Sequence, residues 1–206
     1  MFIVGINGSP ASDGNTAFLL QRILATAASI GARTQLLHAA PLVASAGGTP
    51  FCTVCSNPCS GVCFKGSPLD SAYETLRQAD AIVLGSPVYF GTVTAQLKAF
   101  FDKTRLLRSQ RGLYNVVGAG ATVAASHYGG QETTMRALHD IMFVQGMLIV
   151  GDGFGQADCG HHGVCAHRPA KEDEQAHRRA DLLAYRLVEV CQATAGLRQR
   201  SPAAGV

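Results

Sequence analysis

The stretch Met1-Phe-Ile-Val-Gly-Ile-Asn-Gly-Ser-Pro-Ala-Ser-Asp-Gly-Asn-Thr16 carries three patterns in succession. Its apolar run, Phe2 to Ile6, is long enough for a buried strand. A loop of Gly, Ser, Asn and Thr follows, and apolar residues then recur at helical spacing from Ala17. We therefore predict a strand, a polar loop and a helix in immediate sequence.

This loop is suited to a phosphate group. The first N–H groups of a helix have no partner within the helix, and the helix dipole adds positive potential at the same place. Ser9, Ser12, Asn15 and Thr16 add small polar side chains. The spacing matches neither the P-loop nor the dinucleotide fingerprint. The alternative is an ordinary helix start, with Asn15 or Thr16 as the N-cap and no ligand.

Length and composition indicate a globular chain of one domain. The chain has 206 residues, of which 47% are hydrophobic and 15% charged, and its net charge is +3. We expect a domain over residues 1–195 and a flexible tail over 196–206. The C-terminal basic residues are interpreted as a solvated helix face plus that tail, not as a nucleic-acid surface: Arg178, Arg179, Arg186, Arg198 and Arg200.

The expected compartment is the cytoplasm. No apolar segment approaches the ~20 residues of a membrane span, and the N-terminus lacks the basic region of a signal peptide. We therefore expect neither membrane nor nucleic acid as a partner. In a reducing compartment, seven cysteines indicate metal or redox chemistry more than structural disulfides.

Strand and helix patterns alternate along the chain. The predicted strands are residues 2–6, 33–40, 81–85, 116–125 and 147–150. The predicted helices begin at residue 17 and cover 68–79, 93–106, 132–145 and 172–191. The helix over 68–79 is capped by Ser67 and directs Leu69, Tyr73 and Leu76 inward. This alternation predicts an α/β fold with a doubly wound, five-stranded parallel sheet.

Ligands of such sheets bind beyond the carboxyl ends of the strands. After the third strand comes Ser86-Pro-Val-Tyr-Phe-Gly-Thr92, whose adjacent aromatic residues can flank a flat ring or merely cap the core. After the fourth strand comes Ser126-His-Tyr-Gly-Gly-Gln-Glu132, a small flexible loop that opens onto a helix. Three loops suited to ligands at one edge of the sheet favour a common binding site.

These motifs resemble those of the flavodoxin-like NAD(P)H-dependent FMN reductase superfamily. Gly8-Ser-Pro10 with Gly14-Asn-Thr16 is similar to its phosphate loop, and Gly85-Ser-Pro-Val-Tyr-Phe-Gly91 and Gly129-Gly-Gln-Glu132 are similar to its second and third FMN loops. The resemblance covers the chain to about residue 190. It implies strand order 2-1-3-4-5, bound FMN and a homodimer or homotetramer. The implied FMN contacts are Ser9, Asn15, Thr16 and Ala17 for the phosphate, and Pro87, Val88, Tyr89, Phe90, Gly91, Ser126, His127, Gly129 and Gly130 for the ring.

Four cysteines lie close together in the long irregular stretch 41–66: Cys52, Cys55, Cys59 and Cys63. Thiols this close in sequence can converge on one iron–sulfur cluster. A set of redox-active or free thiols and a zinc site are the alternatives, although zinc ribbons usually join two pairs from separate segments. The stretch also resembles the loop of iron–sulfur flavoproteins, which carry a [4Fe–4S] cluster beside FMN. Its third gap is one residue longer than the typical one, and Ser67-Pro68 stands where that branch often has two acidic residues.

A second group of ligand-type residues is Asp158-Cys-Gly-His-His-Gly-Val-Cys-Ala-His167. Sulfur and imidazole suit zinc, but clustered histidines in a glycine-rich loop are more often polar surface. We interpret Cys191 as a buried apolar residue, and Lys98 with Asp102 as a surface pair.

The function implied is that of an FMN-dependent oxidoreductase or electron-transfer protein. It would pass electrons between a reduced donor (NAD(P)H or ferredoxin), FMN and an acceptor, which is a small molecule or a redox protein. The flavin carries the chemistry, so no protein residue is assigned as catalytic. Two alternatives are an NAD(P)H:FMN or quinone reductase without a cluster, and a flavodoxin-like binding module that has lost its flavin.

Overall fold

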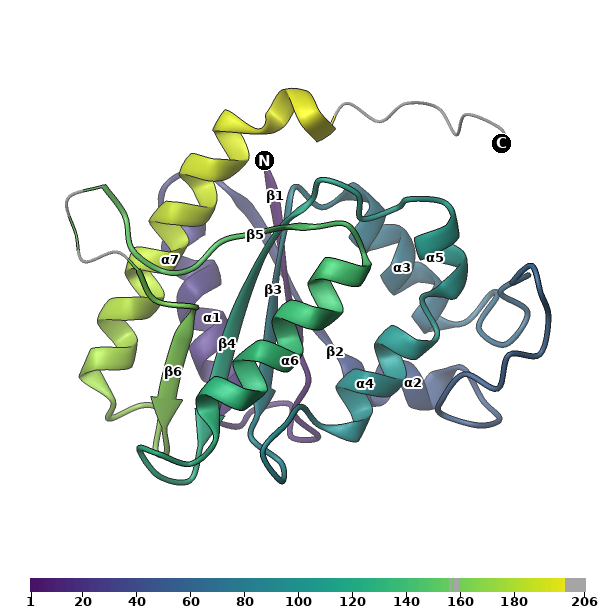
Figure 1. Cartoon of the computed structure of the whole chain (residues 1–206), viewed down its shortest axis with the longest axis horizontal. Coiled ribbons are helices and arrows are strands. Elements are labelled where there is room, and N and C mark those ends of the chain that lie inside the picture. Colours follow the sequence, from purple (N-terminus) through teal and green to yellow (C-terminus); the bar gives the residue numbers. More distant parts are fainter. Residues whose placement is uncertain (156, 158–159, 199–206) are drawn as a thin grey trace.

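The computed structural model describes residues 1–155, 157 and 160–198 and is organised around a parallel sheet (Figure 1). Its strands are β1 (Phe2–Asn7), β2 (Arg33–His38), β3 (Ala81–Pro87), β4 (Val117–Ala124), β5 (Leu148–Ile149) and β6 (Val164–His167). The order is β2-β1-β3-β4-β5, with β6 also paired to β4, and every pairing is parallel. The flavodoxin-like order predicted from the resemblance is confirmed.

Helices cover both faces of this sheet, so its central strands β1, β3 and β4 are buried and consist mainly of apolar residues. The helices are α1 (Asn15–Ser29), α2 (Ala39–Ser45), α3 (Pro68–Gln78), α4 (Ala95–Asp102), α5 (Arg105–Ser109), α6 (Gln131–Val144), α7 (Glu174–Ala193) and the 3₁₀ turn η1 (Ala195–Arg198). Residues of α1 and α7 form one core cluster with the sheet. Residues of α2 to α6 form the other, which includes the predicted core residues Leu69, Tyr73 and Leu76.

The predicted fifth strand, 147–150, is divided into two parts. β5 pairs only with Val117 and Gly118 at the start of β4, whereas β6 pairs with the segment from Ala121 to Ala124 near its end. The chain leaves the sheet between β5 and β6 and then returns to the same edge. Sequence reading missed β6, because we interpreted its Val-Cys-Ala-His pattern as part of a polar loop.

The predicted helix over 93–106 is also two elements, α4 and α5. The Thr104 hydroxyl donates a hydrogen bond of 2.7 Å to the Phe101 carbonyl and accepts one of 2.8 Å from Gln145. Side-chain bonds of this kind compete with the helical ladder, and the chain turns here. Similarly, α2 occupies the start of the stretch that we expected to be irregular from residue 41.

Two of the C-terminal arginines are not solvated, contrary to the prediction. Arg179 is 7% exposed and pairs with buried Asp152, and Arg198 pairs with Asp80 at 3.3 Å. The segment 195–198 forms a 3₁₀ turn that the Arg198 side chain ties to Asp80, and Arg200 lies outside the described residues. Cys191 is fully buried, as predicted, and burial raises the pKa of its thiol to about 11. In the described part of the chain, no helix is both long and apolar enough to span a membrane.

Candidate functional site

The loops after β1, β3 and β4 meet at the carboxyl edge of the sheet. The Gly8 amide donates to the Gly85 carbonyl at 2.7 Å, and the Thr94 hydroxyl donates to the Gly8 carbonyl at 2.5 Å. A Cβ atom on Gly8 would stand 2.8 Å from the Gly85 oxygen, so only glycine permits this approach. The second and third loops also meet, since a Cβ atom on Gly130 would lie 3.2 Å from the Val88 side chain.

The helix that begins in the first loop has a free N-terminus. Gly14 is the N-cap and supplies no side-chain bond, so neither Asn15 nor Thr16 is the cap. The first ladder bond runs from the Phe18 amide to the Gly14 carbonyl, at 3.0 Å. Within the described residues the amides of Asn15, Thr16 and Ala17 have no acceptor, and the first turn carries no acid. Such a helix end is suited to an anion.

The polar side chains of this loop have different local partners. The Ser9 hydroxyl accepts from the Ala11 amide at 3.1 Å, which shapes the loop. The Asn15 side-chain oxygen accepts from the Ala170 amide at 2.8 Å, so its NH₂ group remains as a donor. Thr16 is 2% exposed, and its hydroxyl has no hydrogen bond to the described part of the protein. The predicted phosphate contacts thus lie together around the start of α1.

The second loop ends in a tight turn that exposes its aromatic residues. Tyr89 and Thr92 exchange backbone hydrogen bonds of 3.0 and 3.1 Å, and Phe90 and Gly91 between them have φ values of 50° and 77°. Positive φ at both central positions is typical of a type I′ turn. Tyr89 is half exposed, and the Phe90 side chain projects fully into solvent. Pro87 and Val88 are half-buried beneath the turn.

Gln131, at the start of α6, fixes the third loop. Its side chain accepts from the Gly129 amide at 2.8 Å and donates to the Ser126 carbonyl at 2.7 Å. Tyr128, at the tip of the loop, is fully exposed, and Gly130 has φ of 93°. Sequence reading quoted Gln131 within the Gly-Gly-Gln-Glu motif but gave it no role. The structure shows it as the residue that shapes this loop.

Behind the third loop, the ring of His127 packs against that of His167, which we had considered only as a metal ligand. The rings of His127 and His167 are 3.9 Å apart, and Nδ1 of His167 lies 2.8 Å from the Asp173 carboxylate. Burial opposes ionisation of Asp173, but bonds from the Ala176 amide and from the amide and ring of His167 outweigh it. They hold the pKa of Asp173 below its usual range.

A cavity of about 580 Å³ lies beside this loop, between α6 and α7 along the edge of β6. Its lining includes His127, Tyr128, Glu132, Cys165 and Arg179. The cavity therefore adjoins the predicted ring site and offers charged and aromatic groups to a small molecule.

The four-cysteine loop lies at the opposite side of the molecule from β6, beyond α2, α4 and α5 (Figure 1). None of Cys52, Cys55, Cys59 and Cys63 forms a disulfide, and Cys63 packs against the core beside Phe64. Burial raises the pKa of the Cys63 thiol. The Lys103 charge opposes this shift, whereas the three other thiols reinforce it. The three other sulfurs thus lie within electrostatic reach of Cys63.

Different kinds of metal site require different spacings of their thiolate ligands. Among the described residues, no three His, Cys, Asp or Glu side chains gather closely enough to hold a metal ion. A [4Fe–4S] cluster places its four thiolates on four separate irons, so they stand further apart than around one zinc ion. Four free, coupled thiols on an irregular loop fit the donor set of such a cluster. For the second predicted metal group, Asp158 and Cys159 lie outside the described residues.

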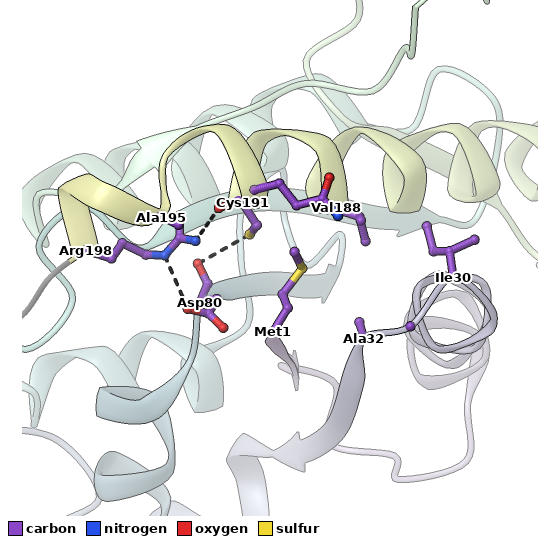
Figure 2. A pocket seen from close by; sticks show the side chains of 10 residues that line it. Met1, Ile30, Ala32, Asp80, Val188, Cys191, Ala195 and Arg198 are labelled. Atoms are coloured by element: carbon purple, nitrogen blue, oxygen red, sulfur yellow. Dashed lines mark hydrogen bonds and ion pairs between the residues drawn. The ribbon is translucent and has the colours of Figure 1, made fainter.

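A second cavity, of about 380 Å³, lies at the far, amino-terminal end of the strands (Figure 2). Met1, Asp80, Cys191 and Arg198 line it, and the Arg198 guanidinium reaches both Asp80 and the Cys191 carbonyl. Its charged groups already neutralise each other, and it lies away from the three loops. We interpret it as the place where the start of β1 meets the segment after α7.

Comparisons with known proteins agree with this geometry. The family described as NADPH-dependent FMN reductase matches residues 1–162. An iron–sulfur flavoprotein of Methanocaldococcus jannaschii is 37% identical over 92% of this chain and 97% of its own length. An NAD(P)H dehydrogenase (quinone) of Trichlorobacter lovleyi is 42% identical, but over only 38% of each chain. The crystal structure of a WrbA-like flavodoxin from Agrobacterium tumefaciens superposes with a TM-score of 0.66 at 19% identity, covering 93% of this chain and 98% of that one.

Proposed function

The chain belongs to the NADPH-dependent FMN reductase family, and we propose that it combines FMN with a [4Fe–4S] cluster held by the four-cysteine loop. It is an FMN-dependent oxidoreductase. The full-length similarity to an iron–sulfur flavoprotein supports the cluster. The similarity to a quinone dehydrogenase covers a little over a third of the chain and supports a reductase without a cluster less well.

The observation that carries the flavin assignment is the free N-terminus of α1 at the meeting point of three loops. We assign the phosphate to Ser9, Asn15, Thr16 and the Ala17 amide. Unpaired N–H groups and the unbonded hydroxyl of Thr16 would supply donors to the dianion without a charged side chain. We assign the ring to Pro87, Val88, Tyr89, Phe90 and Gly91 on one side, and Ser126, His127, Gly129 and Gly130 on the other.

FMN, when bound, supplies the hydride and electron chemistry. The protein's own residues would bind and orient it: the N-terminus of α1 would hold the phosphate, and Gln131 fixes the third loop, which would lie beside the ring. The exposed Phe90 and Tyr128 side chains would border the ring site on the side that a donor or acceptor can reach. For the cluster, Cys52, Cys55, Cys59 and Cys63 would each supply one thiolate.

The donor is NAD(P)H or a ferredoxin, and the acceptor is a small molecule or a redox protein. We further propose a homodimer or homotetramer, since exposed aromatic residues near a site are typical of interaction surfaces. A thiolate-bound iron–sulfur centre suits a reducing compartment, which supports the cytoplasm.

The test is an absorption spectrum of protein purified without air, with iron, zinc and acid-labile sulfide assayed on the same sample. We expect flavin bands together with a broad cluster shoulder, and about four irons and four sulfides per chain. The Cys59→Ser and Cys63→Ser double variant should keep the flavin and lose the iron. Flavin without iron after anaerobic reconstitution would overturn the cluster and leave a simple reductase. One zinc ion per chain without iron would show that the four cysteines bind zinc instead of a cluster.

A further inference from the structure

Lys103, in the turn after α4, is a buried cation. It is 2% exposed, and no other lysine in the described part of the chain is buried. Its ammonium makes no hydrogen bond or ion pair with the described residues. A charge out of water is costly unless an opposite charge meets it. The position of Lys103 therefore calls for an anionic neighbour.

The turn that carries Lys103 packs against the four-cysteine loop. Arg105 donates to the Ser56 carbonyl at 3.4 Å, between the second and third cysteines. A Cβ atom on Gly61 would stand 2.8 Å from Leu106, so the loop and the start of α5 are in close contact. The Lys103 charge reaches the Cys63 thiol electrostatically.

Among the residues that the structure describes, no carboxylate forms an ion pair with Lys103. The sequence contains no Asp or Glu between Asp13 and Asp70. Asp102, the neighbour of Lys103, pairs instead with Lys98 at 2.5 Å. Asp70 accepts a bond of 2.9 Å from the Gly66 amide. The thiol of Cys63, with the three thiols that act on it, is the remaining group that can carry negative charge near Lys103.

We propose that Lys103 provides the fixed positive charge that stabilises the reduced state of the four-cysteine centre and so raises its reduction potential. This inference rests on the proposed function. A one-electron reduction adds one negative charge to a site already bound by four thiolates. A nearby cation lowers the energy of the more negative state, and its effect is strong where water does not screen it.

The experiment is an anaerobic redox titration of the cluster-loaded protein, followed by the absorption and electron paramagnetic resonance of the centre. In Lys103→Met, the equilibrium constant for one-electron reduction should fall at least about tenfold, which corresponds to a potential about 59 mV lower. Lys103→Arg keeps the charge and should stay near the wild-type potential. FMN content and the melting temperature report whether each variant is folded.

Lys65→Met is the matched control. Lys65 lies only two residues after Cys63 but is exposed, so solvent and salt screen its charge. We expect its loss to change the equilibrium constant less than about twofold, because exposed charges interact weakly. The difference between wild type and Lys103→Met should persist when the ionic strength is raised.

The outcomes separate this inference from the proposed function. A fully loaded Lys103→Met protein with the wild-type potential overturns the role of Lys103 and leaves the cluster intact. Wild-type protein without iron and sulfide overturns both. If neither Lys103→Met nor Lys103→Gln loads a cluster while Lys103→Arg does, the charge is needed to hold the anionic centre, which supports the inference.

Discussion

Thr16 illustrates how much one hydroxyl contributes at a helix start. Its side chain is buried at the first turn of α1 and is unbonded within the described protein, beside three unpaired amides. We expect Thr16→Val to weaken FMN binding by about 1.5–3 kcal/mol, since a bond to a charged phosphate is lost. A fluorescence titration of apoprotein with FMN measures this change.

Thr75→Val is the control for Thr16, because the Thr75 hydroxyl bonds only to the Ser71 carbonyl within α3. It should leave the FMN affinity unchanged. Equal affinity of wild type and Thr16→Val would remove the first loop from the phosphate site.

Arg179 is a second single residue whose loss should have a large effect, because it belongs to a buried ion pair. It pairs with Asp152, whose side chain is 1% exposed. Arg179→Met leaves the buried Asp152 carboxylate without its ion-pair partner, so it should lower the free energy of unfolding by about 3–5 kcal/mol. Urea denaturation measures this loss. Arg186→Met removes an exposed pair with Glu189 on the same helix and should cost under about 1 kcal/mol; similar losses in the two variants would contradict our account of the buried pair.

At the scale of elements, Asp173 joins β6 to α7. It caps α7 through a bond of 2.9 Å from the Ala176 amide and binds both the amide and the ring of His167, the last residue of β6. His167 in turn stacks on His127 in the third loop. One carboxylate therefore holds a strand end, a helix start and a site loop in place.

This contact predicts an acid-dependent loss of stability. The pKa of Asp173 is lowered in the folded state, so its contribution is full above the unfolded pKa of about 3.9 and is lost as the pH falls through the lower folded value. Wild type should exceed Asp173→Asn in stability at neutral pH, and the difference should shrink below about pH 4. Denaturation over a pH series tests this, and a pH-independent difference would contradict it.

The sequence predicted helices and strands best where a single pattern of apolar residues continued along the whole element. The apolar runs of β1 and β3 and the inward face of α3 were predicted correctly, because burial on both faces leaves a plain signal. The break between α4 and α5 was missed, since it depends on the Thr104–Gln145 bond, which joins residues far apart in sequence. β6 was missed for the same reason: only its pairing with β4 distinguishes it from a loop.

At the scale of the whole molecule, the order of the parallel strands determines which loops meet at the carboxyl edge of the sheet. This is why the three site loops could be predicted from the sequence. The sequence shows which loops follow which strands, and the parallel order brings them together. The residues that hold the site loops and the four-cysteine loop in place could not be predicted in this way. Lys103 and Asp173 act through contacts that only the folded chain creates, and Arg179 and Arg198 were interpreted as solvated because nothing local indicates their partners.

At the amino-terminal edge of the sheet, opposite the site loops, the start of β1 lies beside the segment after α7 (Figure 2). Asp80 accepts from the Phe2 amide at 2.7 Å and from Arg198 at 3.3 Å, so it connects β1 with the segment after α7.

We expect Arg198→Met to lower the free energy of unfolding by about 1–2 kcal/mol. The loss is modest because Asp80 is partly exposed, so solvent screens its charge. Arg136→Met, an exposed change on α6, should leave stability unchanged. Since the join lies far from the site loops, FMN affinity should equal that of wild type in both variants. A loss of affinity in Arg198→Met alone would show that the two edges of the sheet are coupled.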